Sequence, residues 1–125
     1  MQKTDTPSEL LELRDLVREF ADERDWDKFH TPKNLAIALS VEASELLEPF
    51  QWLHSGSKDE IDGKKVKTIS HEMADVLMYL VRLADKMDVD LRTAFFEKIE
   101  LNRLKYPANK VRGDSRKYNE YGDEG

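Results

Sequence analysis

Hydrophobic residues recur along most of the chain at the spacing of amphipathic α-helices. Between positions 7 and 23 they fall near three- and four-residue spacing, which places them on one helix face; they are Leu10, Leu11, Leu13, Leu16, Val17 and Phe20. Comparable stretches cover 32–53, 65–87 and 91–106. The pattern predicts an all-α fold, and we expect the four segments to form a four-helix bundle.

Two of these segments begin with a helix-start signal. Thr6 is placed as an N-cap, with Pro7 at the first helical position and Glu9 placed to complete a capping box. Thr31 and Pro32 repeat the signal before the second segment.

The last helix sets the expected limit of the domain. Asp90 can cap it, and it ends at Tyr106 because Pro107 cannot continue it comfortably. The remaining residues are polar and carry too little apolar content for another core element. A chain of 125 residues fits one domain. We therefore predict a helical domain over 1–107 and a polar tail or lid over 108–125.

Charge and composition narrow the possible functions. The net charge of −6 argues against a nucleic-acid polymer as partner, because several phosphates would need neutralising cations. The chain has no cysteine, which excludes disulfides, thiolate catalysis and Cys-ligated metals. No apolar run approaches membrane-spanning length. We expect a cytoplasmic protein without a membrane partner.

Acidic residues occupy positions where the helical pattern calls for apolar ones. In the second segment, Glu42 falls within the apolar stripe and Glu45 on its flank, whereas Glu48 lies near the polar face. In the third segment the flank of the stripe carries Glu72 and Asp75, followed one turn later by Tyr79. The apolar stripe of that segment consists of Ile69, Met73, Val76, Leu80, Leu83 and Met87.

Residues three apart on a helix are neighbours, so each acidic pair can reach a common point. Two carboxylates about 4 Å apart repel by about 4 kcal/mol at an effective dielectric near 20, so a group of four requires a cation. Oxygen ligands without His or Cys suit Mg²⁺, with Mn²⁺ as a substitute. A single such pair more often marks a solvated face; the inward placement on two helices favours metal binding. No acid here has the Glu-x-x-His spacing of di-iron bundles.

A resemblance to a known family is carried by three segments: ERDWDKFHTPKNLAIALSVEASELLEPFQW, HEMADVLMYLVRLAD and KIELNRLKYP. They resemble the MazG-type all-α NTP pyrophosphatases, in particular the dCTP pyrophosphatase branch and its bacterial relatives. The resemblance runs from about Leu10 to Pro107. It implies a homodimer or homotetramer that cleaves a nucleoside triphosphate to the monophosphate and pyrophosphate. Pro49 departs from the family pattern and predicts a kink beside Glu45.

The resemblance also assigns roles to individual residues. It implies that the metal ligands are Glu42, Glu45, Glu72 and Asp75. It implies that the base is enclosed by Trp26, His30, Trp52 and Tyr79, and that Lys98 and Asn102 face the nucleotide. On their residue types alone, the two tryptophans fit a packed core equally well, and Lys98 an exposed surface.

The expected activity is Mg²⁺-dependent hydrolysis of dCTP or a modified dCTP. Glu42 and Glu45 would act at the metal, with Glu45 orienting or deprotonating the attacking water, and Lys98 would stabilise the leaving group, with Arg112 or Lys110 beside it. The second segment is apolar over most of its circumference, which predicts a homo-oligomer. Alternatives are a dUTP/dUDP hydrolase, a house-cleaning enzyme for damaged nucleotides, or a non-catalytic helical partner protein.

Overall fold

The computed structural model describes residues 8–113, and all regular secondary structure in this range is helical. The all-α prediction is therefore confirmed. The chain divides into a first unit, Met1–Val89, and a second unit, Asp90–Gly125, and each is described by itself. The predicted boundary at Pro107 and the four-helix arrangement stay predictions.

Helix α1 (Glu9–Glu23) starts later than the sequence pattern indicated. Its N-cap is Ser8, whose side chain accepts a hydrogen bond from the Leu10 amide at 3.2 Å. Thr6 and Pro7 lie outside the described residues. Starting at Glu9 places two acids in the first turn, where the helix dipole favours negative charge. Because Ser8 is the N-cap and Glu9 is the first helical residue, Glu9 is not at the third helical position that a capping box requires, and the predicted capping box is wrong.

Helix α2 (Pro32–Leu47) begins where predicted, with the Thr31 hydroxyl accepting from the Asn34 amide at 3.2 Å. The apolar pattern predicts a helix that reaches Leu53, but α2 ends at Leu47. Pro49 is the physical reason, because it offers no amide hydrogen to the carbonyl of Glu45. The chain continues through non-helical turns to a short 3₁₀ helix, η3 (Lys58–Glu60).

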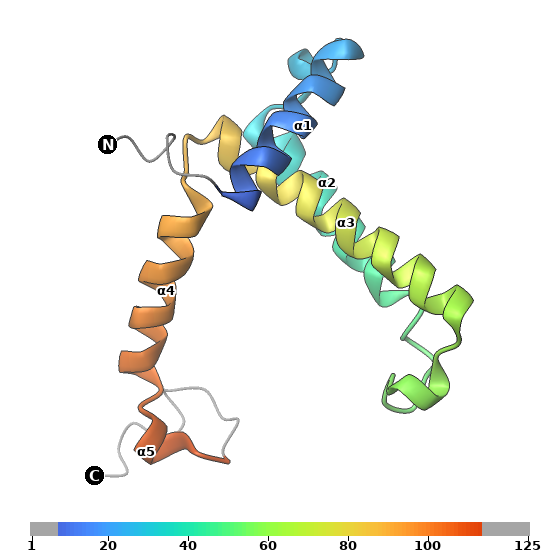
Figure 1. Cartoon of the computed structure of the whole chain (residues 1–125), viewed down its shortest axis with the longest axis vertical. Coiled ribbons are helices and arrows are strands. Elements are labelled where there is room, and N and C mark those ends of the chain that lie inside the picture. Colours follow the sequence, from blue (N-terminus) through green and yellow to red (C-terminus); the bar gives the residue numbers. More distant parts are fainter. Residues whose placement is uncertain (1–7, 114–125) are drawn as a thin grey trace. The chain divides into compact units, whose positions relative to one another are not determined.

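Helix α3 (Gly63–Lys86) is the longest element of the first unit. The Asp62 side chain caps it by accepting from the Lys65 amide at 2.8 Å, so it starts two residues before the predicted position. Helix α2 lies alongside α3, and α1 packs against the C-terminal part of α3 (Figure 1). A second 3₁₀ helix, η2 (Asp27–Phe29), connects α1 to α2.

The core of the first unit is small. Among its described residues, the buried apolar ones are Ala21, Leu35, Ile69, Val81 and Ala84. The predicted stripe of α3 is only partly buried, because Met73 and Met87 are each 55% exposed and Leu80 is 37% exposed. Arg82 is buried instead, at 4% exposure.

The second unit contains α4 (Leu91–Lys105) and α5 (Ala108–Val111). Helix α4 confirms the predicted start and end, because the Asp90 side chain accepts from the Thr93 amide at 3.0 Å and the helix stops before Tyr106. Helix α5 is a single turn inside the segment expected to be a polar tail or lid. No helix among the described residues is long and apolar enough to cross a membrane.

Candidate functional site

An acidic cluster forms where α2 and α3 lie side by side. Each of Glu42, Glu45 and Glu72 offers one carboxylate oxygen, and these oxygens all lie within 4.8 Å of one another. All three side chains are half-buried. The spacing on α2 brings two acids to one face, and α3 supplies the third from the opposite side.

Two oxygens of this cluster lack a hydrogen-bond partner. Glu42 Oε2 and Glu72 Oε2 are buried, and no donor in the described part of the chain reaches them. A buried carboxylate oxygen without a donor is costly, and neighbouring carboxylates increase the cost by repulsion. A divalent cation would give these oxygens a partner and would offset the repulsion between the carboxylates, so the residues present fit an oxygen-ligated metal such as Mg²⁺.

The electrostatics of the cluster agree with a cation site. The pKa of Glu42 is raised to about 7, first by a hydrogen bond with Glu45, then by burial and the negative charge of the neighbouring acids. The pKa of Glu72 is also raised, mainly by burial and then by the charges of Glu45, Asp75 and Glu48. Neighbouring acids with raised pKa values are typical of functional sites.

Asp75, the fourth expected ligand, lies beside the group of three. Its carboxylate is not one of the oxygens within 4.8 Å, but its charge raises the pKa of both Glu42 and Glu72. Glu48 is exposed, as its position on the polar face predicted. The charge of Glu48 nevertheless raises the pKa of Glu72, an effect that the helical pattern did not indicate.

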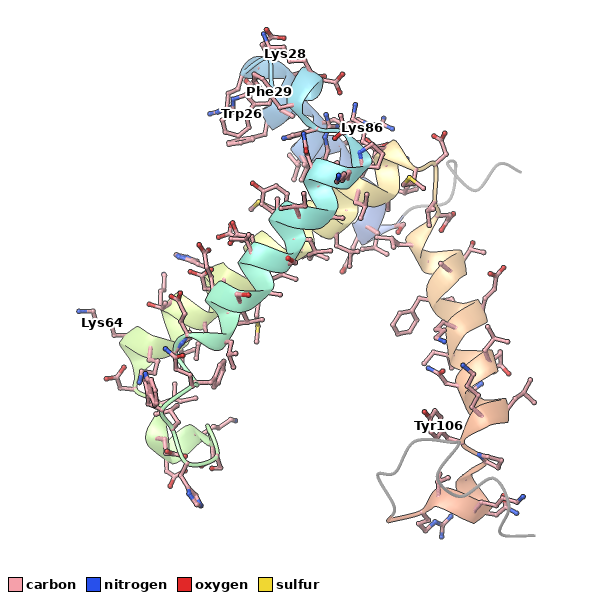
Figure 2. All side chains as sticks on the ribbon, turned by 180° about the vertical axis from the view of Figure 1, so that it is seen from behind. Trp26, Lys28, Phe29, Lys64, Lys86 and Tyr106 are labelled. Atoms are coloured by element: carbon pink, nitrogen blue, oxygen red, sulfur yellow. The ribbon has the colours of Figure 1, made fainter. Side chains whose placement is uncertain are left out.

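Trp26 lies near the end of α3 that carries Lys86 (Figure 2), and its ring contacts that of His30. Their rings are 6.3 Å apart between centroids, in an edge-to-face arrangement, and Trp26 is 41% exposed. His30 Nδ1 accepts a hydrogen bond from Arg82 Nε at 3.1 Å. Arg82 was not among the predicted site residues; a lone arginine inside the apolar run VLMYLVRLAD was the signal, because a buried arginine needs partners.

The remaining expected site residues are spread over both units. Tyr79 is half-buried on α3, one turn after Asp75. Trp52 follows α2 and is 88% exposed, which contradicts the core-filling interpretation of this side chain within the chain itself. Lys98 is exposed and Asn102 is half-buried, and both belong to α4 in the second unit. Their roles stay predictions.

Comparison with known proteins identifies relatives over most of the chain. Residues 37–121 match the model of the MazG-like family. Human dCTP pyrophosphatase 1 is 44% identical over 89% of this chain and 66% of its own length, and the mouse protein of that name is 43% identical over 87% and 65%. The chain thus spans slightly less than two thirds of these relatives.

A solved structure gives the same assignment. A pyrophosphatase from Archaeoglobus fulgidus DSM 4304 is 43% identical, with a TM-score of 0.74 over 82% of this chain and 95% of its own. Family model, sequence relatives and structure therefore agree: the chain belongs to the MazG-like family.

Proposed function

We propose that this chain is a Mg²⁺-dependent pyrophosphohydrolase that converts dCTP, or a modified dCTP, to the monophosphate and pyrophosphate. The observation that carries the proposal is the acidic cluster with its two buried, unpartnered carboxylate oxygens. The names of the mammalian relatives favour dCTP over dUTP and over damaged nucleotides as substrate. Relatives named as enzymes also favour catalysis over a purely structural partner role.

The acids hold the metal in this scheme. Glu42, Glu45 and Glu72 supply the oxygens that already converge. Asp75, three residues after Glu72 on α3, is the proposed fourth ligand, and its charge already raises the pKa of Glu42. When bound, Mg²⁺ supplies charge neutralisation for the triphosphate and makes its phosphorus a better target for attack by water. Two of the ligand oxygens accept no hydrogen bond from the described residues, so they lose none when they take up this role.

Glu45 is the residue we assign to the attacking water. It orients the water or accepts its proton while the water oxygen bonds to the α-phosphorus and the bond to the bridging α–β oxygen breaks. Pyrophosphate leaves with that bridging oxygen. Lys98, with Arg112 or Lys110, stabilises the negative charge of the leaving group, because a cation near the departing oxygens lowers the barrier most where charge develops.

Aromatic side chains enclose the base in the proposed complex. Trp26 and His30 already form one edge-to-face pair. Tyr79 follows Asp75 by one turn of α3, and this spacing supports a position for its ring next to the metal end of the nucleotide. Trp52 and Asn102 complete the expected contacts. Trp52 is 88% exposed, and a stacked base would cover its ring.

A homo-oligomer, either a dimer or a tetramer, accounts for the exposed apolar surface. On α2, Ile37 is 52% exposed, Val41 is 50% exposed and Leu47 is 59% exposed. Exposed apolar residues on α3 include Val66 and Met73. Ile37 and Val41 lie one turn apart and share a face of α2, and an exposed apolar helix face is typical of protein interfaces.

Pyrophosphate release tests the proposal directly. We expect release from dCTP with Mg²⁺ and none with EDTA, and weaker release from dUTP and the ribonucleotides. Glu42→Ala and Asp75→Ala should abolish turnover while circular dichroism shows unchanged helicity. Glu19→Ala and Asp22→Ala change exposed acids on α1 and serve as matched controls. Activity of Glu42→Ala at saturating Mg²⁺, or no pyrophosphate from any triphosphate, would overturn the proposal.

A further inference from the structure

Arg82 joins three parts of the first unit through one buried guanidinium. Its Nε donates to His30 Nδ1 at 3.1 Å, and one terminal nitrogen donates to Asp27 Oδ1 at 3.0 Å. The other terminal nitrogen lies 3.6 Å from Asp85, which in turn pairs with Arg18 of α1. The side chain is 5% exposed, so its planar fork has little freedom to rearrange.

The hydrogen bond from Arg82 Nε to His30 Nδ1 determines which ring nitrogen of His30 carries the hydrogen. Arg82 is always protonated and can only donate, so His30 Nδ1 must accept and a neutral imidazole carries its hydrogen on Nε2. Burial lowers the pKa of His30 first, and the charges of Arg82 and Lys86 lower it further, which favours the neutral ring. His30 therefore presents a single N–H donor, at Nε2.

The position of this donor suits contact with a base, an argument that rests on the proposed function. Arg82 lies seven residues after Asp75 on α3, about 10 Å along the helix axis. His30 also lies beside the Trp26 ring, a flat apolar surface that is partly exposed. A nucleotide with its phosphates at the acidic cluster can reach this end of the α2–α3 pair with its base.

We propose that Arg82 is a positioning residue for base selection: it fixes His30 as the Nε2–H tautomer, and this donor favours cytosine over uracil. Atom N3 of cytosine accepts a hydrogen bond, whereas N3 of uracil carries a hydrogen and opposes a second donor. Lysine in place of Arg82 keeps the charge but lacks the planar fork that reaches His30 and Asp27 together.

Nitrogen NMR of the histidines tests the first half of the proposal without any turnover. The chain has three histidines, so loss of one signal set in His30→Gln assigns His30. We expect a single Nε2–H tautomer in the wild type and a mixture of tautomers in Arg82→Lys. A wild-type Nδ1–H tautomer, or an unchanged Nε2–H tautomer in Arg82→Lys, would overturn the assignment of Arg82.

Selectivity between dCTP and dUTP tests the second half. In Arg82→Lys we expect KM for dCTP to rise roughly three- to tenfold, the loss expected for one neutral hydrogen bond, with kcat little changed. The preference for dCTP over dUTP should fall by the same factor. Arg103→Lys is the matched control, because Arg103 lies on α4 with 70% of its side chain exposed.

Two substitutions at His30 keep the test decisive should Arg82→Lys fail to fold. Glutamine places an amide N–H near the Nε2 position and should retain selectivity, whereas asparagine places it near Nδ1 and should lose it. Equal selectivity in both variants would overturn the proposal while leaving the proposed hydrolase activity intact. Should the wild type release no pyrophosphate at all, the proposed function fails. Movement of the His30 Nε2 signal on adding dCMP then supports base contact, and its absence refutes it.

Discussion

Replacing Glu42 by glutamine should stabilise the metal-free protein and weaken its response to Mg²⁺. The substitution keeps the size of the side chain and removes one negative charge from the acidic cluster. At a separation of 4.8 Å two carboxylates repel by about 3.5 kcal/mol at an effective dielectric near 20, and by about 0.9 kcal/mol in water. Glu42 has two such neighbours, Glu45 and Glu72. Because Glu42 is half-buried, the repulsion from each neighbour should lie between these two energies.

The raised pKa of Glu42 gives the pH range of this effect. Its folded pKa is about 7 against an ordinary value of 4.5, first because of the hydrogen bond with Glu45 and then because of burial. The folded state therefore holds the Glu42 proton more tightly, and the contribution of Glu42 to wild-type stability falls as pH rises from 4.5 to 7. Glutamine does not titrate. The advantage of Glu42→Gln should be small near pH 5 and complete at pH 8.

Thermal unfolding in EDTA at pH 8 measures the effect. We expect Glu42→Gln to be more stable than the wild type by about 1–3 kcal/mol, a rise in Tm of about 4–12 °C. Mg²⁺ at a hundredfold excess over its Kd should stabilise the wild type by about 2.7 kcal/mol and the variant much less. Glu19→Gln, at an exposed acid of α1, controls for a general charge effect. Lower stability of Glu42→Gln without metal, or equal gains from Mg²⁺, would refute the reasoning.

Three further perturbations test the fold and the assembly. Asp85→Asn should lower the free energy of unfolding in urea by about 1–2 kcal/mol at pH 7, because Arg18 loses its charged partner. The hydrogen bond with Arg18 lowers the pKa of Asp85, so this difference should disappear as pH falls below 3.8 through the folded pKa. A pH-independent difference would contradict the ion-pair explanation. Leu35→Ala, at a side chain 1% exposed, should cost about 2–5 kcal/mol in the same urea titration, and a loss below 1 kcal/mol would show that Leu35 is not a core residue. Val41→Glu on the exposed face of α2 should reduce the mass from light scattering to that of one chain, and an unchanged oligomer mass would exclude this face as the interface.

Helical periodicity alone is sufficient to predict that the acids meet. Glu42 occupies an apolar position of α2, and Glu72 lies on the flank of the α3 stripe, so two packed helices place them near one another. The start and end of α4 also follow from the sequence, since Asp90 and Pro107 are strong local signals. These features depend on residues close in sequence, where the helix itself fixes the geometry.

Predictions that depend on neighbours in space are weaker. The helical wheel groups Met73 and Leu80 with Ile69 but does not tell which of them another helix covers, and both are exposed. The sequence predicts a helix that kinks at Pro49 and continues to Leu53, whereas α2 ends at Leu47, because the missing amide hydrogen weakens the helix just before that proline. Periodicity does not single out Arg82, because its partners, Asp27 and His30, lie more than fifty residues away in sequence.

The C-terminal end of α3 and its middle are stabilised in opposite ways. At the C-terminal end, buried and half-buried charges are paired, with Asp85 bonded to Arg18 and Asp27 bonded to Arg82. In the middle of α3, where Glu72 lies near Glu42 of α2, like charges meet and two oxygens lack a donor among the described residues. The paired charges therefore hold α1 and the η2 segment against α3 without a ligand, while the acidic cluster gains a stabilising partner only when a cation binds. In such an arrangement metal binding would strengthen the packing of α2 on α3 at the place where the reaction is proposed to occur.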